Sequence, residues 1–473
     1  MSFEFNGEQR SYLTIDKSEA RPSFAPVRRE WIEVPGRAGS ILTRSKTEIR
    51  KISIPVNVFY GNFTELQEIK TDLAKWLVHE QEKKLVFPDE PGRSYNAILD
   101  GGIDFDELLG VGKGIITFIC LDPYKYAPPK SDTFNNGIVT VSNNGTAPTP
   151  PVYEIDVLED ITHLDIISDE SYIRIGEPAP ASEPVYARQT LVLSDSLKTL
   201  IGWSDVTNVD NGYVAGTMTA TQAGFTATGF GTELSPRRWQ GPAKRKSLPR
   251  PVQNFQMIAT VDLLNVAKQT GMIEIYCLDA FGNTVAKVGI EDIMQSVAEI
   301  QAKFQLGNVA NRKVQHYVTA DYKPAWNNYT GVLRLFRDGN RFRPYFGLVQ
   351  PDGRHVWVAS KYLYTDVAGD YAAPITQIQI AERKWPGTTE AVMRVRDLKV
   401  WELNDPVEGL PYLARAGDKI IIDTKESVVL LNGEPIQKDF FSDYFDLEPG
   451  QTTLLMQPAD KVSGKVIVTE RYL

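Results

Sequence analysis

The stretch EPAPASEPVYARQ (residues 177–189) interrupts a long series of predicted β-strands and decides how this chain of 473 residues is divided. Its three prolines cannot donate to a strand ladder, and no run of β-forming residues separates them. Such a stretch marks a domain boundary. It either joins two complete domains or interrupts one domain that resumes later in the chain.

A second break, LNDPVEGLP (residues 403–411), favours the interruption. The residues after it predict only a few strands, and residues 131–176 also predict too few for a domain of their own. A β unit that small, without disulfides or a metal, buries too little apolar surface to be comfortable alone. We therefore expect these two pieces to form one domain around an insertion.

The N-terminal residues 1–130 mix strands with one helix. KISIPVNVFY (residues 51–60) alternates apolar and polar side chains, which predicts a half-buried strand. Pro55 within it predicts an edge position or a bulge, because proline donates no ladder hydrogen bond. An apolar stripe at helical spacing follows, and Thr64 with Gln67 predicts a capping box at the start of that helix. This order of elements describes an α+β domain.

Residues 186–404 predict numerous strands without helices between them. Residues 298–306 alternate apolar and polar side chains, which favours a strand although part of their spacing also allows a helix. A change of phase near Arg396 and Asp397 predicts a β-bulge. Strands this numerous imply a sandwich or a jelly roll.

Charge and composition argue against several classes of protein. The formal net charge of −9 argues against a general nucleic-acid binder. No run approaches the roughly 18 apolar residues that span a membrane, and the N-terminus shows no apolar region of a signal peptide. Cys120 and Cys277 lie in apolar runs, so we expect two buried thiols in a protein made in a reducing cytoplasm.

No motif for catalysis or for a cofactor is found in the sequence. It contains neither G-x-S-x-G nor a phosphate-binding loop, and its histidines are scattered without metal-ligand spacing. Its acidic residues cluster only as neighbours within one loop, whereas glycoside hydrolysis needs two opposed carboxyl groups. We expect a protein that is not an enzyme, with no catalytic residue, no cofactor and no metal.

Five stretches near the two ends of the chain are specific in combination. They are RREWIEVPGRAGSILTRSK (28–46), ISIPVNVFYGNFTELQEIKTDLAKWL (52–77), GKGIITFICLDPYKYAP (112–128), AGDKIIIDTKESVVLLNGEP (416–435) and FDLEPGQTTL (445–454). Together they resemble the distal tail protein of long-tailed (siphovirus) phages of Gram-positive bacteria. The extra residues between them resemble the lectin-like, carbohydrate-binding jelly rolls of enlarged members of that family.

The resemblance implies a fold that is mainly β. It implies an α+β belt domain at residues 1–130, and a galectin-like β-sandwich split between residues 131–185 and 405–473. An inserted β jelly-roll domain would occupy residues 186–404.

The resemblance also implies a function. The protein would be a structural component of the tail tip or baseplate, and its belt domains would form a hexameric hub ring. It would contact the tail tube and the tail-tip or tape-measure proteins, with no nucleic acid and no membrane as partner. The insertion would bind host cell-wall polysaccharide or teichoic acid. The location would be the virion tail tip, after synthesis in the bacterial host cytoplasm. The alternatives are a wall-polymer glycoside hydrolase and a stand-alone carbohydrate-binding lectin.

Candidate sugar-binding residues lie in the insertion, because flat aromatic rings contact the apolar faces of sugars and polar neighbours fix the hydroxyls. The candidates are Trp326, Asn327, Tyr329, Trp357, Arg343 and Tyr345. For any single tryptophan, packing in a core is the competing interpretation.

Two basic segments are further candidates. In VPGRAGSILTRSK, the side chains of Arg37, Arg44 and Lys46 would contact a neighbouring subunit, unless the segment is only a mobile surface hairpin. SPRRWQGPAKRKSLPRP (residues 235–251) would bind an anionic phosphate polymer, unless it is only a solvated loop.

Overall fold

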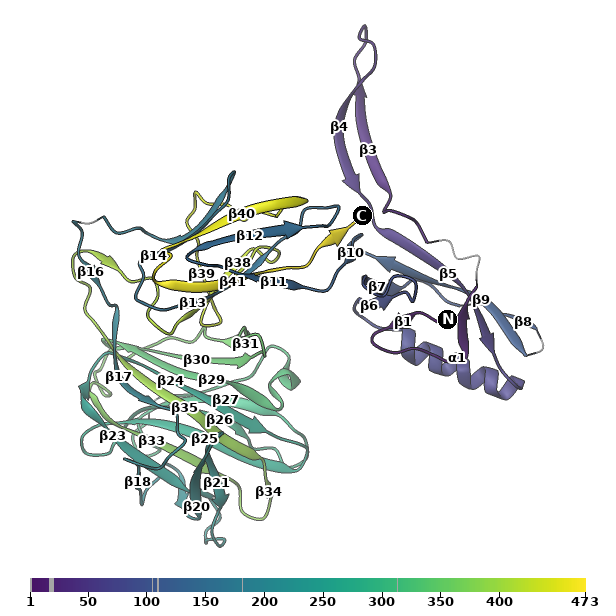
Figure 1. The fold of residues 1–473 in the computed structure, drawn as a ribbon. Helices are drawn as coiled ribbons and strands as arrows, with labels where there is room; N and C mark the ends of the chain where they lie inside the picture. The colour runs from purple at the N-terminus through teal and green to yellow at the C-terminus, as the bar shows by residue number, and fades with distance from the viewer. Residues whose placement is uncertain (1, 17–20, 104, 109, 181, 313) are drawn as a thin grey trace. The chain divides into compact units, whose positions relative to one another are not determined.

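The computed structural model describes residues 2–16, 21–103, 105–108, 110–180, 182–312 and 314–473 (Figure 1). The chain forms two compact units. The first contains Met1–Gly176, Arg415–Val429 and Ile436–Leu473, and the second contains Glu177–Ala414 and Leu430–Pro435. The first unit is therefore built from both ends of the chain. Among the described residues, no helix has the length and apolar character needed to cross a membrane.

The N-terminal part of the first unit is a sheet covered by one helix. The sheet has the order β1-β6-β7-β9-β5-β2, with β8 paired to β9. Its strands are β1 (Glu4–Phe5), β2 (Leu13–Ile15), β5 (Arg50–Phe59), β6 (Lys83–Val86), β7 (Tyr95–Leu99), β8 (Asp106–Leu108) and β9 (Val111–Cys120). Helix α1 (Phe63–Leu77) buries the predicted apolar stripe against this sheet, namely Leu66, Ile69, Leu73, Trp76 and Leu77.

Two local predictions in this region are wrong. Helix α1 is capped by Asn62, whose side chain accepts a hydrogen bond from the Glu65 N–H at 3.0 Å, so Thr64 and Gln67 form no capping box. Strand β5 lies between β2 and β9, so Pro55 is not on an edge strand. The last residue of β5 that pairs with β2 is Val56, and next to it the Asp16 N–H donates to the Pro55 carbonyl. The N–H that proline lacks therefore falls where the pairing between β2 and β5 ends.

A two-stranded ribbon, called the arm here, extends over residues 27–47. It consists of β3 (Val27–Glu33) and β4 (Ser40–Thr47), which pair only with each other. Every residue of β3 is exposed, including Trp31 at 61% and Ile32 at 56%. Because an isolated hairpin is marginally stable in water, a ribbon that exposes these large apolar side chains is suited to packing against a partner.

Both ends of the chain build a β-sandwich, and all its strands except parts of β38 and β39 belong to the first unit. One sheet has the order β11-β41-β13-β37-β38-β39 and the other β12-β40-β14-β15. Strand β13 pairs with β37 on one side and with β41 on the other, so the C-terminal strands flank an N-terminal one. The expected split sandwich within a mainly β fold is confirmed. The strands are β11 (Lys130–Thr133), β12 (Ile138–Asn143), β13 (Val152–Val157), β14 (His163–Ile167), β15 (Tyr172–Gly176), β37 (Lys419–Asp423), β38 (Val428–Leu431), β39 (Glu434–Ile436), β40 (Gly450–Gln457) and β41 (Val462–Val468).

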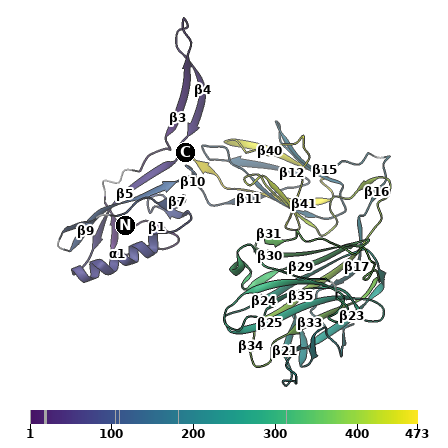
Figure 2. The ribbon, with the colours of Figure 1, turned by 180° about the vertical axis from the view of Figure 1, so that it is seen from behind.

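The second unit is a jelly roll of two stacked sheets (Figure 2). The nine-stranded sheet contains β17 (Gln189–Asp195), β20 (Thr217–Thr221), β21 (Gly224–Gly229), β24 (Phe255–Leu264), β29 (Tyr329–Asp338), β30 (Arg341–Val349), β31 (His355–Ala359), β32 (Tyr364–Thr365) and β35 (Val392–Leu403). The eight-stranded sheet contains β18 (Ser204–Asp205), β23 (Ala243–Val252), β25 (Gln269–Leu278), β26 (Thr284–Asp292), β27 (Ile300–Leu306), β28 (Val314–Val318), β33 (Ile375–Arg383) and β34 (Thr389–Glu390).

Alternation along the strands places one continuous core between these two sheets. Ile273, Ile275 and Cys277 of β25 are completely buried in it. Strand β27 confirms the strand predicted around residues 298–306, and the register shift of β35 opposite Thr260 and Val261 confirms the bulge near Arg396. The unit begins and ends with two short parallel strands, β16 (Val185–Tyr186) and β36 (Leu410–Pro411), which lie side by side.

Candidate functional site

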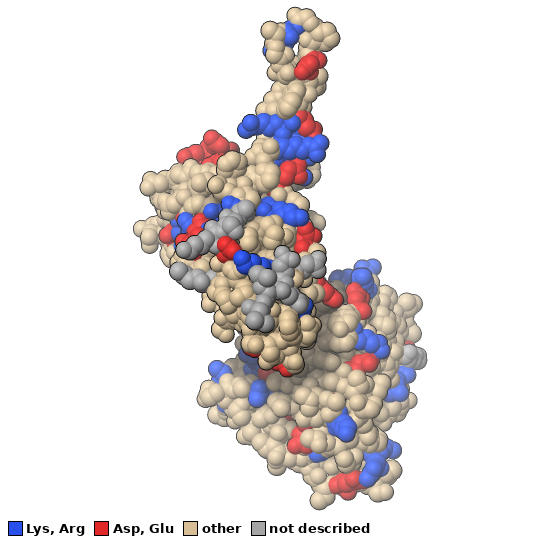
Figure 3. All heavy atoms as spheres, turned by 90° about the vertical axis from the view of Figure 1, so that its right-hand side faces the viewer, with Lys and Arg blue, Asp and Glu red and all other residues tan. Residues whose placement is uncertain are grey.

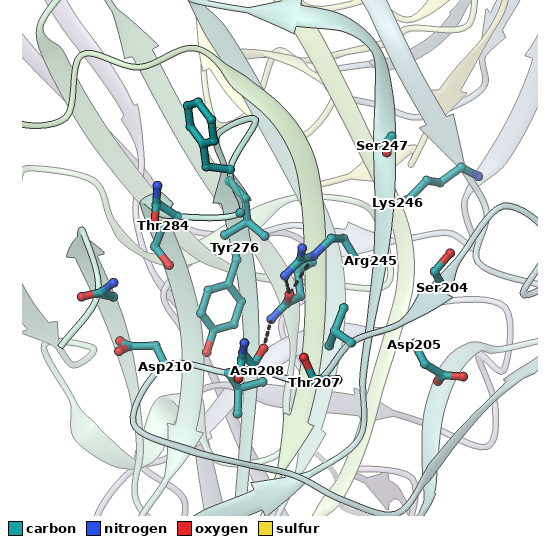
Figure 4. Close-up of a pocket in the computed structure, with 18 of the residues that line it drawn as sticks. Ser204, Asp205, Thr207, Asn208, Asp210, Arg245, Lys246, Ser247, Tyr276 and Thr284 are labelled. Atoms are coloured by element: carbon teal, nitrogen blue, oxygen red, sulfur yellow. Dashed lines mark hydrogen bonds between the residues drawn. The ribbon is translucent and has the colours of Figure 1, made fainter. Parts of the chain in front are cut away.

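A pocket of about 1070 Å³ lies on the face of the eight-stranded sheet that points away from the core (Figure 4). Its floor contains Arg245 of β23, Tyr276 of β25 and Gln379 of β33. One wall is a segment of residues 204–211, called the strap here, which begins at the sheet edge and continues over this face. The turn of residues 281–284 and the segment 308–310 complete the rim.

The strap is held by apolar packing and by one carboxylate. Val206 and Val209 pack against a small cluster that includes Tyr276 and Leu278. The Asp210 carboxylate accepts hydrogen bonds from Lys287 Nζ at 2.8 Å and from the Val309 N–H at 2.6 Å. Burial disfavours the charged form of Asp210, but Lys287 outweighs it and the pKa of that carboxyl is lowered. The wall is therefore a fixed part of the pocket.

Under the strap lies a buried cluster of ion pairs. The side chain of Glu274 has no exposed surface and contacts Lys287 at 3.0 Å, Lys303 at 2.8 Å and Arg383. Burial opposes its ionisation, yet these cations bring the pKa of Glu274 well below its usual value. The cluster contains three acidic and three basic side chains, namely Asp210, Glu274, Glu291, Lys287, Lys303 and Arg383.

Arg245 is the charged group that the pocket leaves uncompensated. Its Nε and Nη2 donate to Gln379 Oε1 at 3.1 and 2.8 Å, and its Nη1 donates to Gln377 Oε1 at 3.2 Å. Among the described residues, its side chain donates only to these two glutamines and to no acidic side chain. Burial lowers the pKa of this guanidinium, and no neighbouring carboxylate counteracts that effect. Amide oxygens alone therefore orient the positive charge.

An aromatic ring stands at the pocket rim. Phe281 is 90% exposed. Its turn is fixed by Asp279, whose carboxylate accepts hydrogen bonds from the Phe281 N–H at 2.9 Å and the Asn283 N–H at 2.8 Å. A rigid turn that holds a large apolar ring in water presents a flat surface for a ligand.

Two of the six predicted sugar-binding residues are buried in the core. Trp326 and Tyr329 have no exposed surface, and their rings contact each other edge to face. Trp326 lies in a short 3-10 turn, η1 (Lys323–Trp326), and its indole N–H donates to the Trp357 carbonyl at 3.0 Å. Neither ring offers a face to a sugar, so the prediction is wrong for both.

Tyr345 is also unavailable. It is 5% exposed, the Arg334 guanidinium covers its ring at 4.2 Å, and its hydroxyl lies 2.7 Å from His355 Nδ1. Asn327 is half-buried and donates to the Ala298 carbonyl. The ring and hydroxyl of Tyr345 and the amide N–H of Asn327 are thus engaged within the protein, and the Asn327 side-chain oxygen is buried.

Arg343 and Trp357 remain exposed. Trp357 is 47% exposed, and its ring lies 6.4 Å from that of Tyr322. Arg343, Trp357 and Tyr322 do not line the pocket that contains Arg245 and Phe281, so they form a separate surface.

The predicted ring-contact residues all lie on the arm. Arg37 is in its turn, and Arg44 and Lys46 are on β4, all exposed to solvent. Figure 3 shows Lys and Arg side chains gathered on the lower part of the arm. Arg28, Arg44 and Lys46 line a shallow hollow there together with Glu30 and Glu48. The structure thus brings two of the three predicted residues together.

The two ends of the chain match known protein families. Residues 7–120 match the phage tail protein RIFT-related domain. Residues 384–472 match the C-terminal domain of the siphovirus-type tail component. Both ends of the chain are therefore similar to domains of siphovirus tail proteins. The resemblance inferred from the sequence is confirmed.

A curated relative of these siphovirus tail domains is the distal tail protein of Bacillus phage SPP1. It is 28% identical over 120 residues, which are 25% of this chain and 47% of the relative. The chain thus matches about half the length of that relative.

Three solved structures are similar to parts or all of the chain. The SPP1 distal tail protein, described as a hub adsorption apparatus in phages infecting Gram-positive bacteria, has a TM-score of 0.40 at 11% identity over 100% of this chain and 99% of its own. The CBM2 module of the evolved Dit of Lactobacillus casei phage J-1 has a TM-score of 0.39 at 13% identity, and the match covers 46% of this chain and 98% of the module. A Bacillus licheniformis β-glucanase has a TM-score of 0.31 at 12% identity, and the match covers 45% of this chain and 98% of the glucanase. At these TM-scores, none of the three supports a conclusion about this chain.

The siphovirus tail matches leave much of the chain uncovered. Residues 121–383 lie outside both, including strands β11 to β15 of the sandwich. Those strands nevertheless pair with matched ones, as β13 does with β37 and β41. The unmatched strands β11 to β15 therefore form one sandwich with strands of the matched segment.

Among the described residues, no group of three or more His, Cys, Asp and Glu side chains is arranged to hold a metal ion.

The sequence reasoning missed Phe281 and singled out Arg245 only as one of several cations. The signal for Phe281 was available in DAFGN (residues 279–283), where a phenylalanine stands inside an Asp, Gly and Asn turn between two strands.

Proposed function

We propose that this protein is a structural component of a siphophage tail that forms a hexameric hub ring at the distal end. Its inserted β domain then binds host cell-wall glycan. The observation that carries the proposal is the pairing of β13 with β37 and β41, because it joins the ends of the chain into one body that leaves the second unit free for another task. The protein would be made in the host cytoplasm and located at the virion tail tip.

The exposed residues of the arm support the proposal of a ring. A ring needs two different patches on each subunit, since every copy contacts the next one head to tail. The arm offers exposed Trp31 and Leu42, and it carries Arg37, Arg44 and Lys46 as polar contacts around them. We propose that the arm packs on a second copy of the chain, and that the assembled ring contacts the tail tube and the tail-tip or tape-measure proteins.

The pocket supports glycan binding by the inserted domain, for which we propose the boundaries 186–404. It combines an exposed aromatic ring, Phe281, with a fixed guanidinium and exposed polar side chains such as Thr207 and Asn283. This combination suits a sugar, whose faces are apolar and whose edges carry hydroxyls. Six sites on one ring would raise the effective concentration, so a weak single site would suffice. Trp357 and Arg343 are a second proposed contact with the polymer.

The buried ion cluster argues for binding without hydrolysis. Glycoside hydrolysis needs one carboxyl group that donates a proton, and hence a raised pKa. Glu274 is instead enclosed by three cations that lower its pKa, and the strap covers it. Burial raises the pKa of Glu382 well above its usual value, but this side chain has no exposed surface for a substrate to reach. We therefore propose a structural protein and not an enzyme. Release of reducing ends from cell walls incubated with the protein would contradict this part of the proposal.

The two halves of the proposal need separate tests on the full chain. Light scattering after size exclusion should give six times the mass of the chain, and negative-stain electron microscopy should show sixfold rings. Monomer alone at every concentration and in every buffer would refute the ring. Purified Gram-positive cell walls should retain the protein and release it to soluble wall polysaccharide. Failure to be retained by any such wall would refute glycan binding and leave the ring standing.

A further inference from the structure

We propose that the ligand of the pocket is an anionic glycan, and that Arg245 binds its oxyanion, a phosphodiester or a carboxylate. This inference rests on the proposed glycan-binding function and specifies the class of polymer. It follows from the unused donors of Arg245, from the pairing of every other charge around the pocket, and from the way the guanidinium is held.

Arg245 has donors left for a ligand. A guanidinium carries five N–H groups. Three of them donate to Gln377 and Gln379, which leaves two without an acceptor among the described residues. Nε and Nη2 share one acceptor, so the spare donors belong to the two Nη atoms. Both spare N–H groups lie in the plane of the guanidinium and can donate to the oxygens of a phosphate or a carboxylate.

The remaining charges that line the pocket are paired. Lys246 Nζ lies 2.5 Å from Asp195, and Asp205 lies 2.6 Å from Lys244. Asp210 is paired with Lys287. The pocket therefore carries one unneutralised positive charge. A half-buried charge without a counter-ion is unfavourable, and an anionic ligand would supply that counter-ion.

The position of the guanidinium is built into the sheet. Gln379 is 2% exposed, and its own amide donates to the Asn208 carbonyl of the strap at 3.1 Å, which directs its oxygen at Arg245. Gly282 lies against the other side. A Cβ on this residue would be 3.2 Å from Arg245 Nη1, and its φ of +80° also favours glycine. The guanidinium is thus preorganised on both sides.

Phe281 and Arg245 together define the ligand. Phe281 is adjacent to the glycine that contacts Arg245, so the aromatic platform and the cation belong to one site. A free anion would gain nothing from the exposed ring, and a neutral sugar would leave the positive charge uncompensated. A sugar that carries an oxyanion uses both groups.

The test measures binding of the folded full-length chain to defined polymers by titration calorimetry. The polymers are a poly(glycerol phosphate) wall teichoic acid, a uronic-acid polymer and a neutral glucan. The variants are Arg245→Gln, Arg245→Lys and, as a matched control on the same strand but outside the pocket, Arg250→Gln, which removes an exposed charge paired with Glu402. Thermal melting checks that each variant folds.

We expect the wild-type protein to bind a charged polymer and not the neutral one, less tightly as salt is raised. Arg245→Gln should weaken binding roughly 10- to 100-fold, as expected for a hydrogen bond to a charged group. Arg245→Lys should retain part of the affinity that Arg245→Gln loses, and Arg250→Gln should bind with the affinity of the wild type. The polymer that is retained distinguishes a phosphate from a carboxylate ligand.

Two results would overturn the inference in different ways. Equal binding of the neutral glucan by wild type and by Arg245→Gln would refute the anionic ligand and leave the glycan-binding function intact. Absence of binding to all three polymers and to intact cell walls would refute both. If Arg245→Gln does not fold, the preference of the wild-type protein between charged and neutral polymers decides alone.

Discussion

Lys130 donates a hydrogen bond to the Glu470 carboxylate at 2.6 Å, although 340 residues separate them in the sequence. The pair joins β11 to the segment that follows β41, so it ties the two sequence halves of the sandwich together. The same Glu470 oxygen also accepts from the Asn144 N–H at 3.0 Å. Burial opposes ionisation of this carboxyl, but these bonds outweigh it and lower the pKa of Glu470 to about 2.

Replacing Glu470 by Gln should destabilise the sandwich by about 1–3 kcal/mol at neutral pH, because a charged hydrogen-bond acceptor is lost. Its folded-state pKa lies below the usual 4.5, so its contribution is present above pH 4.5 and disappears as the pH falls towards about 2. The difference between wild type and E470Q should therefore shrink in acid. Urea unfolding at pH 7 and pH 3, followed by hydrogen exchange of β11 and β41, measures it.

A suitable control for that experiment is Glu154→Gln. Glu154 pairs with Lys465 at 3.0 Å in the same sandwich, but both side chains are more than a third exposed. An exposed pair contributes about 0–1 kcal/mol, so this variant should unfold almost like the wild type. An equal loss of unfolding free energy in both variants would mean that the buried contact of Glu470 stabilises the sandwich no more than the exposed pair of Glu154.

Trp31→Asp should disrupt the ring. A tryptophan that becomes buried between subunits commonly contributes 2 kcal/mol or more, so assembly should weaken at least ~30-fold. The change should not unfold the subunit, since Trp31 is 61% exposed and contacts no core. Light scattering across a concentration series reads out the mass. The control is Phe281→Asp, which changes an aromatic residue of the inserted domain that is 90% exposed. Loss of the ring in both variants would argue against the arm as the contact.

Asp210→Asn should strongly destabilise the inserted domain. The buried cluster is neutral only when Asp210 is ionised, and its removal leaves Lys287, which is 2% exposed, with an excess of positive charge. Breaking a buried ion pair on one side costs about 3–5 kcal/mol. The control Asp205→Asn lies on the same strap, but its side chain is 87% exposed, so it should be almost neutral. Thermal unfolding followed by tryptophan fluorescence compares the two; similar melting temperatures would mean that the strap is not held by its carboxylate.

Phe281→Ala should weaken glycan binding about fivefold, because an aromatic contact contributes about 1 kcal/mol. Trp357→Ala removes the second exposed aromatic surface and should have a smaller effect on a short oligosaccharide that fills one pocket. Calorimetry with the same wall oligosaccharide compares both variants. A larger loss for W357A would transfer the main site to the surface of Trp357 and Tyr322.

The sequence predicted the fold well because its signals are local and periodic. The stripe of Leu66, Ile69 and Leu73 reports burial directly. The alternation along β27 predicted the strand but not the burial of both its faces, because Lys303 and Gln305 are buried too. The two breaks at residues 177–189 and 403–411 indicated an insertion because the flanking pieces were too small to be domains. The cap at Asn62 was missed because Thr64 and Gln67 have the same spacing as Asn62 and Glu65. The Asn62 side chain accepts from the Glu65 N–H, and the Glu65 carboxylate accepts from the Gly61 N–H.

The site was predicted less well, because a loop signal does not say where a side chain points. KPAWNNY suggested an exposed Trp326, yet the turn directs its ring between the two sheets, where the Trp357 carbonyl satisfies its N–H. The pocket forms where the strap covers strands that are distant in sequence. Only the tertiary structure shows that Arg245 finds two glutamine oxygens and no carboxylate.

The side-by-side pairing of β16 with β36 has an evolutionary consequence. Because the inserted chain begins and ends at neighbouring positions, a recombination event can exchange the whole cassette without breaking any strand pair of the sandwich. In the proposed tail component, such an exchange would change the surface presented to bacteria while the proposed ring-forming parts stay constant. Shifts of host range would then be concentrated between residues 177 and 414.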